Sequence, residues 1–247
     1  MFLLSVVFCM FSCLGNKTKF GAFAEDKEVT VKENIRPFTS LVVDGPYDVY
    51  FCQSDSSFVK MVGGQKQIKN VKLQNRGGQL YISRKKSLLP TGGNNGVDIY
   101  IYSPNLLSVT MCGYGDFSCE RGLDTDTLRV FMNGTGDVEL GNIICDNFSI
   151  VMRGTGDVDV KELQTVSSQI ELYGTGDIDM HERGVAYTSL KMLGCGDVDI
   201  CFDNCGTADC RLTGTGDITL KGDLKKLIKI KRGSGDVDVR KLKVGSE

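Results

Sequence analysis

The sequence contains no tryptophan, only four prolines and a single histidine in 247 residues. With His181 alone, no pair of histidines is available to bind a catalytic metal, and neither a nucleophile elbow nor a phosphate-binding loop is present. The 29 basic and 31 acidic residues give a formal charge of −2, so there is no electrostatic case for binding nucleic acid. The few prolines accompany 30 glycines, which indicates a chain with many tight bends.

The apolar run at the start of the chain, residues 1–13, is too short to span a membrane. It is typical of the apolar region of a secretory signal peptide, although a basic segment before it is missing. Ser12 before Cys13 and the polar run that follows resemble a bacterial lipoprotein signal. We therefore expect residues 1–24 to be a leader and tether, with export to the periplasm, the outer membrane or the cell surface. A lipid on Cys13 would be the only membrane attachment; the alternative is a buried N-terminal strand.

A Gly-x-Gly-Asp motif occurs seven times, with its aspartates 19 to 21 residues apart. A fixed period of this length indicates one structural unit stacked on copies of itself. In the first six copies, the residues at positions −7, −5, +1 and +3 from the aspartate are apolar, and the last copy slips by one position, with Ile228 and Ile230 before the glycines. The aspartates that define the bends are Asp116, Asp137, Asp157, Asp177, Asp197, Asp217 and Asp236.

This pattern is a period of two interrupted by a glycine bend, so each unit reads as strand, bend, strand and turn. Because a short strand pair cannot bury its apolar face alone, the units must stack, which predicts an all-β parallel β-helix (β-solenoid) with about 20 residues per rung. We expect regular rungs over residues 109–240, an irregular β region over 25–108 that forms the first rungs and an N-terminal cap, and a tail over 241–247. Gly45–Tyr50 and Gly96–Tyr100 are degenerate copies of the unit within the irregular region.

Over roughly residues 35 to 240, the order of these segments resembles the putative auto-transporter adhesin, head GIN domain family of Bacteroidetes-type bacteria. The resemblance implies a right-handed β-helix in an exported protein, often a lipoprotein or adhesin, and it supplies no catalytic residues. It is carried by the glycine rungs and by the segments that precede them, Phe38–Val43, Tyr47–Tyr50, Val97–Ile101 and Pro104–Leu106.

Two acidic columns are expected to face outward, the bend aspartates and the residues two positions later. Like charges about 4.8 Å apart repel by roughly 1 kcal/mol per pair in water. In a structural interpretation, each bend aspartate accepts hydrogen bonds from N–H groups of its own glycine bend, as in an Asx-type turn. The second column comprises Glu139, Asp159, Asp179, Asp199 and Asp238, and its expected partners are Arg153, Lys161, Arg183, Lys191 and Lys221.

A calcium-stabilised β-roll is the alternative, because carboxylates repeated along a β-roll bind calcium in the glycine-rich nonapeptide toxins. The thermal stability with added calcium, compared with that in a chelator, would separate the two. We expect no other cofactor. Eight cysteines lie outside the leader, but no two share a column in neighbouring rungs and no C-x-x-C pair occurs, which argues against a disulfide ladder and a zinc site.

A polysaccharide lyase or hydrolase is a third hypothesis, because many such enzymes are β-helices with paired carboxylates. A catalytic site is a local departure, however, whereas this acidic pattern is the same on every rung, so we predict a non-enzymatic interaction protein. Its partner would be a glycan, an envelope protein or a host surface; the alternative is that the outward residues ahead of the bends pack a neighbouring loop. The candidate interaction face is Phe131, Val151, Tyr173, Leu193 and Arg211.

Overall fold

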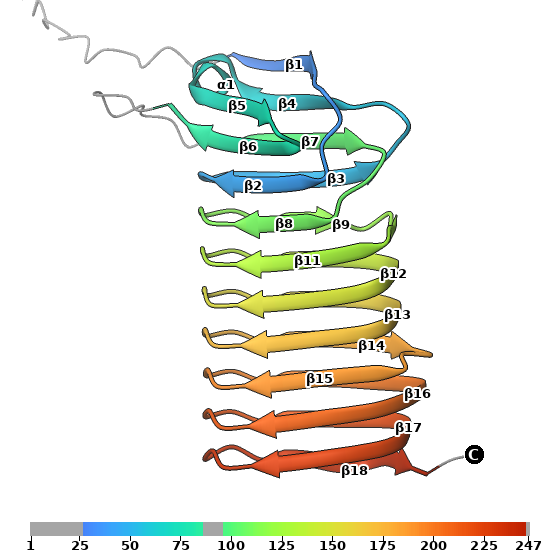
Figure 1. The fold of residues 1–247 in the computed structure, drawn as a ribbon. Helices are drawn as coiled ribbons and strands as arrows, with labels where there is room; N and C mark the ends of the chain where they lie inside the picture. The colour runs from blue at the N-terminus through green and yellow to red at the C-terminus, as the bar shows by residue number, and fades with distance from the viewer. Residues whose placement is uncertain (1–26, 86–95, 246–247) are drawn as a thin grey trace, which may run out of the picture.

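The computed structural model describes residues 27–85 and 96–245. The proposed leader, with Cys13, lies outside these residues. In the described part of the chain, strands stack into an elongated β-solenoid with one short helix at its N-terminal end (Figure 1). Neighbouring regular rungs pair in parallel with an offset of 20 residues, so the predicted fold class is confirmed. No helix of the described residues is long and apolar enough to cross a membrane.

The elements fall into an N-terminal group and the stacked repeats. The N-terminal group consists of β1 (Glu28–Asn34), β2 (Ser40–Asp44), β3 (Tyr47–Gln53), β4 (Phe58–Gly64), α1 (Gln65–Asn70), β5 (Val71–Arg76), β6 (Gln79–Arg84) and β7 (Val97–Ser103). The repeats consist of β8 (Ser108–Met111), β9 (Phe117–Cys119), β10 (Leu123–Asp124), β11 (Thr127–Met132), β12 (Val138–Met152), β13 (Val158–Leu172), β14 (Ile178–Arg183), β15 (Tyr187–Met192), β16 (Val198–Leu212), β17 (Ile218–Lys231) and β18 (Val237–Val244).

Each regular rung has two walls that meet at the Gly-x-Gly-Asp bend. We call the strands that run into a bend the first wall and the strands that leave it the second wall. The bends stack along one edge, at the left of Figure 1. The long strands, such as β12, leave one bend on the second wall and curve round to enter the next bend on the first wall, so Val138 pairs with Val158 and Ile150 with Ile170.

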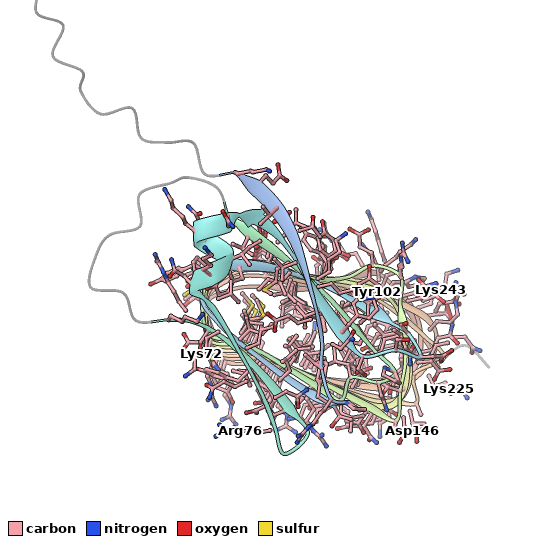
Figure 2. The ribbon with its side chains drawn as sticks, turned by 90° about the horizontal axis from the view of Figure 1, so that it is seen from above. Lys72, Arg76, Tyr102, Asp146, Lys225 and Lys243 are labelled. Carbon is pink, nitrogen blue, oxygen red and sulfur yellow. The ribbon has the colours of Figure 1, made fainter. Side chains whose placement is uncertain are left out.

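The core is the space between the walls, which side chains fill in the view along the axis (Figure 2). In the first six repeats, every residue predicted at positions −7, −5, +1 and +3 is buried. Two further buried columns were not predicted, one nine residues before the bend aspartate, with Leu128 and Phe148, and one six residues after it, with Ile143 and Leu163. Polar residues interrupt both columns in the middle rungs, which hides their apolar character in the sequence.

The rungs of the N-terminal group do not stack in chain order. β2 pairs with both β6 and β8, and β3 pairs with both β7 and β9. The β2–β3 rung, first along the chain, therefore lies between the β6–β7 rung and the β8–β9 rung. Beyond β7 the pairing becomes antiparallel, with β4 on β7, β1 on β4 and β5 on β6. The helix α1 lies at one side of this end of the stack, and its Ile68 is buried in the core (Figure 1).

The predicted slip of the last rung, which would bring Ile228 and Ile230 into the apolar columns, is wrong. The missing residue of this 19-residue repeat is absorbed earlier, by an irregularity between the pairings of Phe202 and Cys205. As a result Lys229 and Lys231 pair opposite buried residues of the preceding rung, and Ile230 is partly exposed. Lysines at inward positions of an open edge hinder pairing with another sheet.

The last strand is longer than the sequence predicted. β18 continues to Val244 and pairs with β17 as far as Leu224. The tail predicted from residue 241 is therefore wrong for residues 241–244, because their backbone completes the hydrogen bonds of the second wall.

Candidate functional site

The close approach of neighbouring rungs explains both glycines of the bend. A Cβ atom on Gly154 would lie 2.0 Å from the carbonyl oxygen of Gly134, and one on Gly156 would lie 2.1 Å from that of Gly136. Gly156 also has a φ of 131°, in the region that favours glycine. Between them, the N–H of Thr155 donates to the carbonyl of Gly134 at 3.0 Å. The bend is thus part of the inter-rung hydrogen-bond ladder rather than a free loop.

The bend aspartates form a second ladder along the same edge. Oδ1 of each bend aspartate from Asp116 to Asp217 accepts the backbone N–H of the aspartate on the next rung, at 2.7 to 2.8 Å. Asp48 of β3 starts the ladder and accepts the N–H of Asp116 at 3.1 Å. The predicted Asx-type turn within one bend is therefore wrong. The other N–H groups of the bend already donate to carbonyls of neighbouring rungs, which leaves the aspartate N–H to the carboxylate before it.

The second acidic column is not neutralised as predicted. Arg183 bridges Glu162 and Asp203, with Nη2–Oε2 and Nε–Oδ2 distances of 3.1 and 2.9 Å. Lys191 binds Glu171 at 3.0 Å. Of this column only the last member has an ion pair among the described residues. A run of unpaired carboxylates therefore follows the second wall from Glu139 to Asp199, in register from rung to rung.

The last member, Asp238, is held by Arg240, whose side chain lowers the pKa of Asp238 to about 2. Within residues 27–85 and 96–245, no group of three or more His, Cys, Asp or Glu side chains is placed to hold a metal ion. A cation on the bend edge would also compete with backbone N–H groups for Oδ1 of the aspartates. The carboxylates of the bend aspartates thus have a role in joining neighbouring rungs.

The five residues predicted as an interaction face lie on the first wall, in two adjacent columns rather than one. Tyr173 and Leu193 are two residues closer to the bend than the other three, and they are 42% and 47% exposed. The guanidinium of Arg153 lies 5.5 Å from the centre of the Tyr173 ring. Tyr173 and Leu193 are therefore partly open to solvent, with Arg153 over the ring of Tyr173. The other column reads Phe131, Val151, Glu171, Lys191 and Arg211 along the axis.

A carboxyl side chain lies inside the solenoid, where the sequence pattern gave no signal for it. Glu182 of β14 is fully buried in the column between Leu163 and Phe202. Its Oε2 accepts a hydrogen bond from the Thr188 hydroxyl, whereas Oε1 and the Ser168 hydroxyl have no such partner among the described residues. Burial raises the pKa of Glu182 to about 7, against a smaller opposing effect of the hydrogen bond from Thr188.

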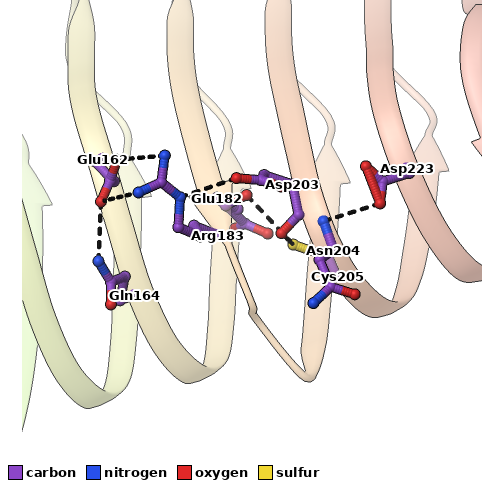
Figure 3. A network of polar contacts seen from close by, with 8 residues as sticks. All are labelled: Glu162, Gln164, Glu182, Arg183, Asp203, Asn204, Cys205 and Asp223. Atoms are coloured by element: carbon purple, nitrogen blue, oxygen red, sulfur yellow. Dashed lines mark hydrogen bonds and ion pairs between the residues drawn. The ribbon is translucent and has the colours of Figure 1, made fainter.

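The surface above Glu182 is held by the ion pairs of Arg183 (Figure 3). Gln164 donates to Glu162 at 2.9 Å, and the N–H of Asn204, which has a φ of 53°, donates to Asp223 at 3.0 Å. Below this network, the Cys205 thiol donates to the carbonyl oxygen of Glu182 at 3.3 Å. Because these contacts join four successive rungs, they fix the edge of the solenoid opposite the bends.

The eight described cysteines are free thiols in this structure. Burial raises the pKa of Cys119 and of Cys210 to about 12, and that of Cys205 to about 11. A buried thiol that stays protonated is a poor nucleophile. These side chains therefore act as small core residues.

An aromatic cluster on the second wall was missed by the sequence analysis. Tyr50 of β3 and Tyr100 of β7 stack with ring centres 4.9 Å apart, and Phe58 of β4 stacks on Tyr102 at 4.3 Å. Tyr102 projects outward from this wall in Figure 2. Two adjoining hollows, of about 290 and 380 Å³, lie beside the cluster and share Glu120. The cluster depends on strands that are distant in sequence, so only the register of β3, β4 and β7 reveals it.

Comparison with known proteins places this geometry in context. The family model described as "Putative auto-transporter adhesin, head GIN domain" matches residues 37–204. A crystal structure of a putative adhesin from Bacteroides fragilis is similar, with a TM-score of 0.77, 23% identity and coverage of 86% of this chain and 96% of that chain.

Two structures from Parabacteroides are also similar, each covering 86% of this chain and 97% of the other. They are a protein titled putative lipid binding protein from P. distasonis, with a TM-score of 0.68 and 21% identity, and a putative adhesin from P. merdae, with a TM-score of 0.64 and 19% identity. At these identities the likeness establishes the fold. No curated protein matches the chain.

Proposed function

The chain belongs to the putative auto-transporter adhesin, head GIN domain family, and from this membership we propose that it is an exported adhesin. In this proposal a lateral wall of the solenoid binds a glycan, an envelope protein or a host surface. In this proposal the protein is not an enzyme, because the bend aspartates repeat on each rung and their carboxylates accept the backbone N–H of the next rung.

The proposal rests on a contrast within the first wall: inward residues keep the same apolar character from rung to rung, whereas outward residues vary. The inward positions seven and five residues before the bend aspartate stay apolar over six rungs. In contrast, the outward column beside them changes from Phe131 and Val151 to Glu171, Lys191 and Arg211. A rigid frame whose outer residues vary suits recognition of one partner over a long, flat surface.

The first test is binding by the first wall. We expect the purified protein to bind spots on an array of glycans and extracellular-matrix proteins, and we expect Phe131→Ala and Tyr173→Ala each to weaken that binding by about tenfold, as for aromatic residues at the centre of an interface. Tyr114→Ala is the matched control, since Tyr114 is exposed and lies within a bend, where it pairs with Thr135, rather than in a strand of the first wall. Binding that survives both substitutions would remove the first wall from the proposal.

The proposal also includes an anchor. Cys13 lies outside the described residues, and the sequence around it supports a lipid on this thiol. In a bacterial host grown with an alkyne fatty acid, the wild-type protein should carry the label and sediment with membranes. Cys13→Ala should lose the label and move to the soluble fraction. Label on the Cys13→Ala protein would contradict lipid attachment at this residue.

A further inference from the structure

The stacked tyrosines of the second wall leave one ring face open. Tyr100 is covered on both sides, by the Tyr50 ring and by the ammonium of Lys60, which lies 4.6 Å from its ring centre. Tyr50 has a ring on one side only and is 38% exposed. On its other side, the next residue in the same outward column is Ser118 of β9. Because a serine side chain is short, no ring or cation among the described residues stacks on the second face of Tyr50, and Ser118, 8% exposed, lies at the base of the space.

The open face borders a slot one rung high. After Ser118 the outward column continues with Glu139 of β12. Strands lie about 4.8 Å apart, so the backbone positions of Tyr50 and Glu139 are about 9.6 Å apart. Tyr50 and Ser118 line the hollow of about 290 Å³, and Glu139 lines the hollow of about 380 Å³ that adjoins it. The space admits a flat ring in contact with Tyr50, since stacked carbon atoms need about 3.5 to 4.0 Å.

The charged residues around the slot indicate which kind of ring could bind there. Glu120 borders both hollows, with Arg121 in one and Lys161 and Asp159 in the other. Carboxylates accept hydrogen bonds from hydroxyl groups, and an arginine donates to them. The carboxylates outnumber the cations, and the unpaired acidic column begins here, so an anionic ring would be repelled. The electron-rich face of a tyrosine attracts weakly positive C–H groups.

We propose that this slot binds one neutral hexopyranose ring of a glycan, with its C–H face stacked on Tyr50 and its hydroxyls bonded to Glu120, Glu139 and Arg121. The inference rests on the proposed function as an adhesin, and it assigns a sugar-binding site to the second wall. A sugar ring fits these features because one of its faces carries C–H groups that can stack on Tyr50, and its edge carries hydroxyl groups that can bond to the charged residues. A site of this kind is concave, preformed and fixed by a few polar groups.

Saturation-transfer NMR on the purified protein tests the proposal with the methyl glycosides of glucose, galactose and mannose. At least one should bind with a Kd of about 1 mM, as expected for a single ring, and its C–H protons on one face should receive the most saturation. Methyl glucuronide, which is anionic, should bind at least about fivefold more weakly. Tyr50→Ala and Ser118→Phe, which fills the slot, should each weaken binding by about tenfold or more, and Tyr50→Phe should preserve it.

Phe58→Ala is the matched control, because Phe58 is also stacked in the cap but lines neither hollow. It should bind sugar as the wild type does, and circular dichroism should show that every variant is folded. The proposal is overturned if none of the three neutral glycosides binds or if the Tyr50→Ala protein binds them as well as the wild type does. In each case, array binding by the wild-type protein shows whether the adhesin function stands without the slot.

Discussion

Replacing Gly156 by alanine is expected to lower the free energy of unfolding by more than about 4 kcal/mol. The new methyl group would clash with the backbone of the neighbouring rung, and the backbone conformation at this position disfavours any residue other than glycine. Its Cβ would lie 2.1 Å from the carbonyl oxygen of Gly136, an atom that cannot rotate away. The φ of 131° is also a conformation that costs a non-glycine residue about 1 to 3 kcal/mol. Relief would require the rungs to separate, which breaks the hydrogen bonds of the bend.

Gly184→Ala is the matched control. Gly184 also has a positive φ, 66°, but a Cβ there would meet nothing within 4 Å. Its substitution should therefore cost only the conformational penalty of about 1 to 2 kcal/mol. Guanidinium denaturation followed by far-UV circular dichroism measures both values.

Each rung of a solenoid contacts only its neighbouring rungs, so the rungs on the two sides of the altered bend can unfold separately. We expect either a single transition at much lower denaturant concentration or two transitions, with hydrogen exchange fastest around the altered bend. Equal stabilities of the two alanine variants would contradict the close approach of rungs as the reason for the Gly-x-Gly pattern.

The regular rungs could be predicted from the sequence because each rung repeats the same arrangement of apolar residues and glycines. Apolar residues on both sides of the bend set which side chains face inward, and the two glycines set where the chain turns. The last rung shows the limit of this reasoning. The alternation of Ile228 and Ile230 favours one register, but backbone pairing with β16 imposes the other and brings Lys229 and Lys231 into line with the core columns.

The order of the N-terminal rungs could not be predicted for a related reason. Residues 47–50 and 97–100 read almost alike, so the sequence does not say which segment stacks on the first glycine rung. The structure places Asp48 there, where its carboxylate accepts the N–H of Asp116. The stacking of Tyr50 on Tyr100 follows from that order alone, which is why the slot was missed.

The outward residues were predicted to be exposed, but their grouping was not resolved. Phe131 and Tyr173 both precede a bend and point away from the core, yet they lie in different columns because a step of two residues preserves the side of the wall. Glu182 was missed because one polar residue in a column of mostly apolar residues leaves the rest of the repeat pattern unchanged. Such residues become visible only once burial is known.

The stability of the wild-type protein is expected to fall as the pH rises from about 4.5 to about 7, through the titration of Glu182. The ordinary pKa of 4.5 applies to the unfolded chain, and burial raises the folded value to about 7. Between these values the folded state binds the proton more tightly, so unfolding releases it and the free energy of unfolding decreases with pH. At 1.36 kcal/mol per pH unit, the loss is about 3 kcal/mol in total.

Glu182→Gln isolates this effect, because the amide keeps the shape and can still accept the Thr188 hydrogen bond without titrating. The two proteins should be close in stability at pH 4.5, and at pH 8 the variant should be the more stable by about 3 kcal/mol, measured by urea denaturation at each pH. Other carboxyls, such as Glu171 and Asp209, have a lowered pKa and act at lower pH in both proteins equally.

Glu162→Gln serves as the control, since it removes a carboxylate of the partly exposed Arg183 network directly above the buried one. A surface pair of this kind contributes about 0 to 1 kcal/mol, and its loss should leave the fall in stability between pH 4.5 and 7 unchanged. If the Glu182→Gln protein shows the same fall as the wild type, the buried carboxyl is not its source. A fall that disappears only in the Glu182→Gln protein would show that the solenoid tolerates this charge in its core at the expense of stability at neutral pH.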